Sequence, residues 1–102
     1  MVKFLIIRFS SIGDIVLTTP VVRGLKTQVD DAEIHYLTKD RYTEILVGNP
    51  YISKVIPCTD NHAALINSLR EEGYDYIIDL QNNLRSRRIK HAMKRMYFTV
   101  IR

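Results

Sequence analysis

Apolar and polar residues follow one another in blocks along this chain, and each block has the period of a strand or of a helix. Short, nearly unbroken apolar runs predict strands that are buried on both faces, at residues 3–8, 33–37, 54–56, 74–80 and 97–101. Apolar residues at helical spacing predict helices at about residues 13–28, 39–47, 61–72 and 84–95. Strands that alternate with helices indicate an α/β domain with a parallel sheet.

Prolines and capping residues add local expectations to this pattern. Pro20 lies inside the first helical segment, which predicts either a kink just before it or a break with Pro20 at the start of a second helix. Thr38 is expected to cap the second helical segment, and Thr59 or Asp60 the third. Pro57 cannot donate to a sheet, so the third strand is expected to end before it.

Right-handed crossovers between such strands favour a three-layer, Rossmann-like, doubly wound sheet of about five strands in the order 3-2-1-4-5. Residues 1–102 are expected to form a single domain, a length sufficient for a core of its own. The first and fourth strands are neighbours in this order, so the loops that follow them open a ligand crevice. The candidate site residues in these loops are Ser10, Ser11, Gly13, Asp14, Gln81, Asn82 and Asn83.

The loop Ser10-Ser11-Ile12-Gly13-Asp14 leads from a strand into a helix, and a helix N-terminus favours anionic groups. Its single glycine does not fit the three-glycine dinucleotide fingerprint, and the chain contains no Walker A motif. Asp14 would repel a phosphate and fits better with a sugar hydroxyl that loses its proton. Ser11-x-x-Asp14 is equally a capping box, so Asp14 is a base, an electrostatic stabiliser or a helix cap at this stage.

Composition narrows the class of protein. The chain is 46% hydrophobic and 25% charged, and its apolar runs are shorter than the roughly 20 residues that span a bilayer, which favours a soluble globular domain. The first residues do not resemble a signal peptide. Cys58 is the single cysteine, which suits a reducing cytosol. His35, His62 and His91 lack the spacing of metal ligands, so no metal site is predicted.

Positive charge is concentrated near the C-terminus. The net charge is +4, and residues 85–95 contain six Lys or Arg and no acid. The rest of the chain carries nine basic and eleven acidic residues, which indicates a local anion-binding patch rather than a basic domain. Nucleic acid is a weaker interpretation, because the nearby aromatic residues Tyr97 and Phe98 fall in a predicted strand.

Several segments resemble the first domain of ADP-heptose:lipopolysaccharide heptosyltransferases, which are glycosyltransferases of the GT-B fold. The strand Phe4-Leu5-Ile6-Ile7-Arg8 followed by Ser10-Ser11-Ile12-Gly13-Asp14-Ile15-Val16-Leu17-Thr18-Thr19-Pro20 is similar to their opening. Three later segments agree in order and spacing: Asn49-Pro50-Tyr51-Ile52, Tyr74-Asp75-Tyr76-Ile77-Ile78-Asp79-Leu80 and Gln81-Asn82-Asn83-Leu84-Arg85-Ser86. Asn82 departs from the pattern, since relatives often carry a small residue such as glycine there.

The resemblance implies the acceptor-binding half of a two-domain enzyme, with the C-terminal donor domain absent from this chain and the chain alone inactive. Asp14 would be the base for direct, inverting displacement, and Ser10, Ser11 and Gly13 would lie near the transferred sugar. The donor would be a nucleotide-sugar of the ADP-heptose kind, without a metal or other cofactor. It also implies a cytoplasmic protein with at most peripheral contact with the inner membrane.

An anionic glycolipid or saccharide is the acceptor that this resemblance implies, because lipopolysaccharide core is densely anionic. Gln81, Asn82, Asn83, Arg85, Arg87 and Arg88 are the candidate acceptor-binding residues. For Lys90, Lys94 and Arg95 a solvated helix face is the favoured interpretation. An alternative function remains open at this point: a non-catalytic α/β module that binds a small anion in the crevice after the first and fourth strands.

Overall fold

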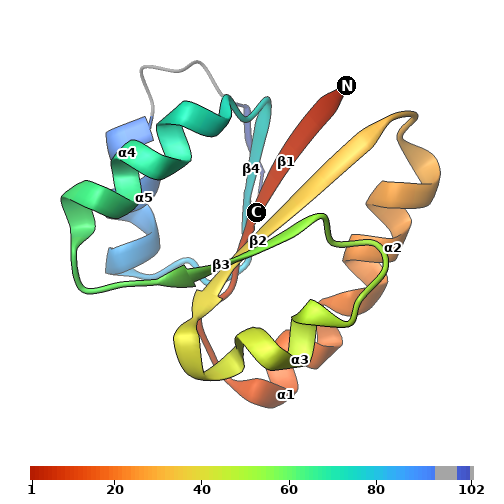
Figure 1. Ribbon diagram of the computed structural model, residues 1–102, viewed down its shortest axis with the longest axis horizontal. Coiled ribbons are helices and arrows are strands. Elements are labelled where there is room, and N and C mark those ends of the chain that lie inside the picture. The colour runs from red at the N-terminus through yellow and green to blue at the C-terminus, as the bar shows by residue number, and fades with distance from the viewer. Residues whose placement is uncertain (94–98, 102) are drawn as a thin grey trace.

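The computed structural model describes residues 1–93 and 99–101, and it contains a parallel sheet (Figure 1). Four strands lie in the order β3-β2-β1-β4, as predicted: β1 (Val2–Ile7), β2 (Ala32–Lys39), β3 (Lys54–Cys58) and β4 (Tyr76–Asp79). In the centre of the sheet, Ile6 of β1 is paired with Tyr36 of β2 and with Ile78 of β4. The carboxyl ends of β1 and β4 therefore meet at one edge of the sheet.

A fifth strand is predicted over residues 97–101. A three-residue segment, β5 (Thr99–Ile101), runs parallel to β4, whereas residues 94–98 and 102 lie outside the described part of the chain. The complete fifth strand and the five-stranded order therefore stay predictions.

Helices cover both faces of the sheet, which confirms the doubly wound, Rossmann-like arrangement (Figure 1). One face carries α1 (Ile12–Leu17), α2 (Thr19–Gln28) and α3 (Thr43–Val47), with the short 3₁₀ helix η1 (Asp40–Tyr42) before α3. The other face carries α4 (His62–Glu72) and α5 (Leu84–Met93). Side chains of β1 alternate between the two cores, with Ile6 packed under the first group of helices and Leu5 under the second.

The first helical segment is broken at Thr18, which confirms the second of the two alternatives for Pro20. Thr18 ends α1 and caps α2, and Pro20 lies in the first turn of α2, where its missing N–H costs no hydrogen bond. The Thr18 hydroxyl donates to the Ile15 carbonyl oxygen at 2.6 Å and lies 2.7 Å from the Tyr36 hydroxyl. Buried side-chain hydrogen bonds thus hold the break against the sheet.

Three local expectations are wrong. Thr38 does not cap a helix, because β2 continues through it and buries it completely. Pro57 lies within β3, where it is tolerated because β3 is the edge strand next to β2. The cap of α4 is Asn61 rather than Thr59 or Asp60, and its Oδ1 accepts a hydrogen bond from the Ala64 N–H at 3.0 Å.

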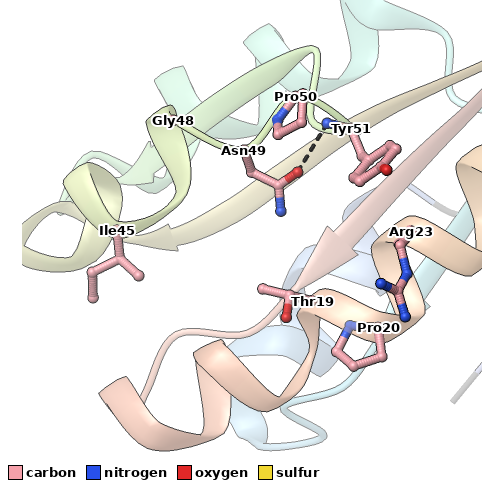
Figure 2. Close-up of a pocket in the computed structure, with 8 residues that line it drawn as sticks. All are labelled: Thr19, Pro20, Arg23, Ile45, Gly48, Asn49, Pro50 and Tyr51. Carbon is pink, nitrogen blue, oxygen red and sulfur yellow. Dashed lines mark hydrogen bonds between the residues drawn. The ribbon is translucent and has the colours of Figure 1, made fainter.

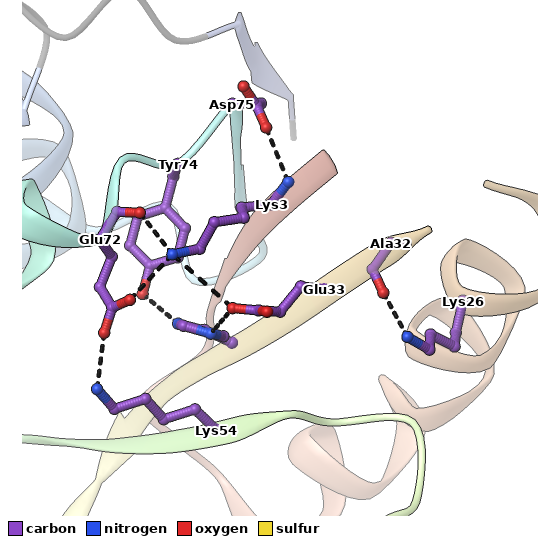
Figure 3. A network of polar contacts seen from close by, with 9 residues as sticks. Lys3, Lys26, Ala32, Glu33, Lys54, Glu72, Tyr74 and Asp75 are labelled. Atoms are coloured by element: carbon purple, nitrogen blue, oxygen red, sulfur yellow. Dashed lines mark hydrogen bonds and ion pairs between the residues drawn. The ribbon is translucent and has the colours of Figure 1, made fainter. Parts of the chain in front are cut away.

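The opposite edge of the sheet, at the amino ends of the strands, holds a network of polar contacts (Figure 3). The Glu72 carboxylate bridges Lys3 and Lys54 at 3.0 and 2.7 Å, which lowers the pKa of Glu72 to about 2 through hydrogen bonds from Lys54 and then Lys3. The buried His35 ring lies 2.7 Å from the Tyr74 hydroxyl. These contacts tie the strand starts to the end of α4, far from the loops after β1 and β4.

No helix in the described residues combines the length and the apolar character needed to cross a bilayer.

Candidate functional site

The two loops that the sequence places at one crevice do contact each other. Gln81, after β4, accepts hydrogen bonds through Oε1 from the backbone N–H groups of Phe9 at 3.0 Å and Ser10 at 3.4 Å, after β1. Gln81 thereby fixes the backbone from which the Ser10–Asp14 loop begins. Its amide oxygen is used in this contact, so Gln81 positions the loop.

The carboxylate of Asp79 holds the loop after β4 in place, and Asp79 was not among the predicted site residues. Its side chain is buried at the end of β4, and Oδ1 accepts hydrogen bonds from the N–H groups of Gln81 at 3.0 Å and Asn82 at 2.8 Å. Oδ2 forms an ion pair with Lys90 of α5 at 2.9 Å. Burial by itself raises the pKa of Asp79, but the hydrogen bonds from Asn82 and Lys90 outweigh it and leave the pKa below its usual value.

The interpretation of Lys90 as part of a solvated face is therefore wrong, because only 15% of its side chain is exposed. A signal for this pair exists in the sequence: Asp79 lies in the apolar run 74–80 of a strand that is covered on both faces. A carboxylate that is buried in a strand requires hydrogen-bond or ion-pair partners. The helix that follows the strand carries basic residues that can supply one.

Asp14 lies in the first turn of α1, in the loop-to-helix segment that follows β1. Oδ2 accepts hydrogen bonds from the Ser11 hydroxyl at 3.0 Å and the Ser11 N–H at 3.3 Å, and it forms an ion pair with Arg8 at 2.9 Å. The Ser11 hydrogen bonds and then Arg8 lower the pKa of Asp14. The capping contacts are thus present, yet 48% of the side chain stays exposed.

Arg8 is a second residue that the sequence analysis missed. It follows β1 directly, and its guanidinium contacts both the Asp14 carboxylate and the Leu80 carbonyl oxygen. One side chain thereby connects the two loops a second time. A cation at the carboxyl end of a buried strand was the available signal, since such a charge needs a nearby acid.

The remaining loop residues have different surroundings. Asn82 has φ of 50°, in the left-handed region that glycine and asparagine tolerate best, so the backbone at this position favours these two residue types. Asn83 caps α5: its Oδ1 accepts from the Ser86 N–H and its N–H donates to the Ser86 hydroxyl, each at 2.9 Å. Around Gly13 an added Cβ would meet no atom within 4 Å, so the space above the first turn of α1 is open.

The three candidate arginines of α5 differ in how they are held. Arg85 donates through Nη2 to the Thr59 carbonyl oxygen at 2.8 Å, and its guanidinium lies 5.7 Å from the centre of the Phe9 ring. Arg87 and Arg88 are exposed. Of the three, Arg85 is therefore the one that is fixed beside the Ser10–Asp14 loop.

A separate hollow of about 410 Å³ lies between α2 and the connection from α3 to β3 (Figure 2). The Asn49-Pro50-Tyr51 segment lines it opposite Arg23 of α2, and Asn49 Oδ1 accepts a hydrogen bond from the Tyr51 N–H at 2.8 Å. No residue of the loops after β1 and β4 lines it.

In the described part of the chain, no three His, Cys, Asp or Glu side chains lie close enough together to hold a metal ion.

A Rossmann-like domain in which polar side chains join the loops after the first and fourth strands is the class that this fold and site define. The chain is similar to lipopolysaccharide heptosyltransferase 1 of Campylobacter coli, with 29% identity over 102 residues that cover 94% of this chain and 30% of the relative. It is also similar to lipopolysaccharide heptosyltransferase 3 of Escherichia coli strain K12, with 35% identity over 78 residues, 67% of this chain and 23% of the relative. No protein-family model matches the chain.

Solved structures agree with these relatives. The ADP-heptose lipopolysaccharide heptosyltransferase II of E. coli superimposes with a TM-score of 0.80 and 26% identity, over 90% of this chain and 28% of that one. The E. coli heptosyltransferase WaaC, solved with ADP, has a TM-score of 0.69 and 20% identity, over 94% of this chain and 33% of that one, which supports the fold. The resemblance to heptosyltransferase-like glycosyltransferases is confirmed, and the chain spans less than a third of the curated relatives' length.

Proposed function

We propose that this chain is the N-terminal, acceptor-binding part of a two-domain GT-B glycosyltransferase, which transfers heptose or a related sugar to a lipopolysaccharide-core acceptor. The similarity to heptosyltransferases supports this function. The observation that carries it is Asp14, a half-exposed carboxylate at the point where the loops after β1 and β4 meet. A complete domain would have the five-stranded order 3-2-1-4-5, and a donor-binding domain would complete the enzyme.

The chemistry proposed for Asp14 is general base catalysis of a direct, inverting displacement. The acceptor hydroxyl oxygen attacks the anomeric carbon of the donor, its proton passes to the carboxylate, and the bond to the nucleotide diphosphate breaks. The lowered pKa of Asp14 keeps the carboxylate ionised at neutral pH and makes it a weak base in the ground state. Proton transfer then takes place as the new bond forms, when the hydroxyl becomes strongly acidic.

The capping and catalytic roles of Asp14 are compatible in this geometry. Its contacts with Ser11 and Arg8 all use Oδ2 and orient the carboxylate, and Oδ1 would accept the proton of the substrate hydroxyl. A carboxylate held in this way meets the positional demand of a catalytic base. Ser11 and Arg8 act as positioning residues for Asp14 in this proposal.

The other candidate residues follow from the layout of the crevice. Ser10, Ser11 and Gly13 would face the transferred sugar and the donor, for which ADP-bound heptosyltransferase structures suggest an ADP-heptose-like nucleotide-sugar. Arg85, Arg87 and Arg88 would bind the anionic acceptor, and Asn82 would contact it as well. Gln81 and Asn83 would hold the backbone of the loops near the acceptor through their hydrogen bonds. The enzyme would act on the cytoplasmic side of the inner membrane, with peripheral contact only and without a metal or other cofactor.

The test is Asp14→Asn in the complete enzyme that contains this domain. Loss of the base should lower kcat by about 100- to 10,000-fold, while the KM for the donor changes little. The matched control is Asp30→Asn, an exposed aspartate in the turn before β2, which should retain activity. A role in capping alone predicts a lower midpoint of urea unfolding with normal kcat, and full turnover by Asp14→Asn would refute the proposal.

A further inference from the structure

Helix α1, which carries Asp14, is too short to hold its own position. It has six residues, Ile12–Leu17, and isolated helices shorter than about 12 residues are marginal in water. Within α1, which the structure describes in full, only Ile15 is buried, whereas Val16 and Leu17 are exposed. The position of the Asp14 carboxylate therefore depends on contacts between the two ends of α1 and the sheet.

The C-terminal end of α1 is tied to β2 by a chain of two buried hydrogen bonds. The Thr18 hydroxyl has one proton, which it donates to the Ile15 carbonyl oxygen at 2.6 Å, so the Tyr36 hydroxyl at 2.7 Å is the donor to Thr18. Burial raises the pKa of Tyr36 to about 12, so its hydroxyl keeps at neutral pH the proton that this bond requires. The chain thus runs from the sheet to the residue that follows Asp14.

The N-terminal end of α1 is tied to the end of β1. Arg8 forms an ion pair with Asp14 at 2.9 Å, whereas the Ser11 contacts of Asp14 lie within the cap and first turn of α1 itself. A movement of α1 against the sheet would therefore lengthen the Arg8–Asp14 pair and leave the Ser11 contacts in place. Ile6 of β1 is paired with Tyr36 of β2, so the two ties hold α1 to neighbouring strands.

We propose that Tyr36 and Thr18 are positioning residues, whose hydrogen-bond chain sets where the Asp14 carboxylate lies relative to the sheet and hence to the reacting groups. This inference rests on the proposed function, in which Asp14 is the base. A misplacement of about 1 Å can cost about 100-fold in rate, because a base works only within hydrogen-bond distance of the proton that it accepts. Both side chains are buried, so they act through α1 and not by contact with a substrate.

The first test measures the kinetics of variants of the complete enzyme that contains this domain. Tyr36→Phe and Thr18→Val each remove one hydroxyl of the chain and should lower kcat about tenfold, while the KM for the donor stays within about twofold. Thr18→Ser keeps the hydroxyl and should recover most of the activity. In the double variant, Tyr36→Phe should add little to Thr18→Val, because the two hydroxyls act in one chain.

Tyr74→Phe is the matched control for Tyr36→Phe. It removes the hydroxyl of another fully buried tyrosine, whose contact with His35 lies at the amino ends of the strands. It should therefore lower the urea midpoint to a similar degree and leave kcat unchanged. A general loss of stability would lower the activity of both variants alike, whereas a positioning role lowers only that of Tyr36→Phe.

A second readout does not depend on turnover. In this chain, Arg8 contributes to the lowered pKa of Asp14, after the hydrogen bonds from Ser11. When α1 moves away from Arg8, the pKa of Asp14 should rise towards its ordinary value of 3.8, which the carboxyl carbon signal in an NMR pH titration measures. Tyr36→Phe should show this rise, and Tyr74→Phe should not.

Three results would overturn the positioning role: full kcat in Tyr36→Phe, an equal loss of kcat in Tyr74→Phe, or an unchanged pKa of Asp14 in Tyr36→Phe. Each variant is first compared with the unchanged protein by its amide spectrum, and Tyr36→Phe carries the test if Thr18→Val does not fold. An active Asp14→Asn enzyme refutes the proposed function and leaves the pKa result standing. An inactive Asp14→Asn enzyme together with full turnover by Tyr36→Phe removes the positioning role alone.

Discussion

Asp79→Ala should destabilise the domain strongly and disturb the crevice at the same time. The substitution leaves the largely buried Lys90 ammonium without its partner at 2.9 Å and removes the acceptor of two backbone N–H groups, those of Gln81 and Asn82. Removing one member of a buried ion pair typically costs about 3–5 kcal/mol. We therefore expect a loss of about 4 kcal/mol in the free energy of unfolding, which is a large part of the total for a domain of this size.

Urea unfolding followed by circular dichroism measures this loss. Asp79→Asn keeps an oxygen for the two N–H groups but not the charge for Lys90, so it should lose about 2–3 kcal/mol and remains measurable if the alanine variant does not fold. Asp30→Ala, an exposed aspartate, serves as the control and should change stability by less than about 0.5 kcal/mol. Because the turn holds Gln81, the amide signals of Phe9 and Ser10 should also shift in the Asp79 variants.

The pH dependence gives an independent check on the same residue. Its folded pKa lies below the ordinary value of 3.8, so ionised Asp79 stabilises the domain above that pH, and the contribution disappears as the pH falls through the folded pKa. Asp79→Asn should remove this part of the acid sensitivity. A stability of Asp79→Ala within about 0.5 kcal/mol of the unchanged chain at pH 7 would refute the reasoning.

Further predictions concern the far edge of the sheet and the crevice turn. Glu72→Gln should lower the free energy of unfolding by about 1–2 kcal/mol at pH 7. The pKa of Glu72 is lowered from 4.5 to about 2, chiefly by Lys54. In urea titrations, the difference in stability from the unchanged chain should therefore shrink as the pH falls from 4.5 towards 2. Tyr74→Phe removes the hydroxyl partner of buried His35 and should lower the free energy of unfolding by about 1–3 kcal/mol; an unchanged urea midpoint would contradict this. At the left-handed Asn82, Gly should be tolerated within about 0.5 kcal/mol and Val should cost about 1–2 kcal/mol, and equal melting temperatures for the two variants would count against backbone strain there.

The convergence of the two loops was predictable because strand order follows from few rules. Nearly continuous apolar runs mark buried parallel strands, and right-handed crossovers leave few orders for them. Gln81 at the end of one strand and Ser10 at the end of another were therefore expected together, and the hydrogen bonds between them confirm it. The break at Thr18 was also predictable, because Pro20 restricts the backbone next to it.

Helix faces were less predictable than strands. In the first helical segment, predicted over residues 13–28, the apolar residue Val16 is 49% exposed, whereas its neighbour Ile15 is fully buried. A single apolar stripe requires one continuous helix, and the break at Thr18 divides the segment into two. Caps such as Asn61 were missed because several neighbouring residues have equal capping ability, and only packing of the helix selects one of them.

By itself, the sequence determined the alternation of strands and helices, the order of the four described strands and which two loops meet, because these depend on hydrophobic period and chain direction. Tertiary structure alone decided which charges meet. Arg8 with Asp14 and Asp79 with Lys90 join residues 6 and 11 positions apart, and the partners of such charges follow from strand register and helix rotation. The separation of two residues along the chain does not predict the distance between their side chains. The contacts around Asp14 and Asp79 are therefore known only from the folded domain.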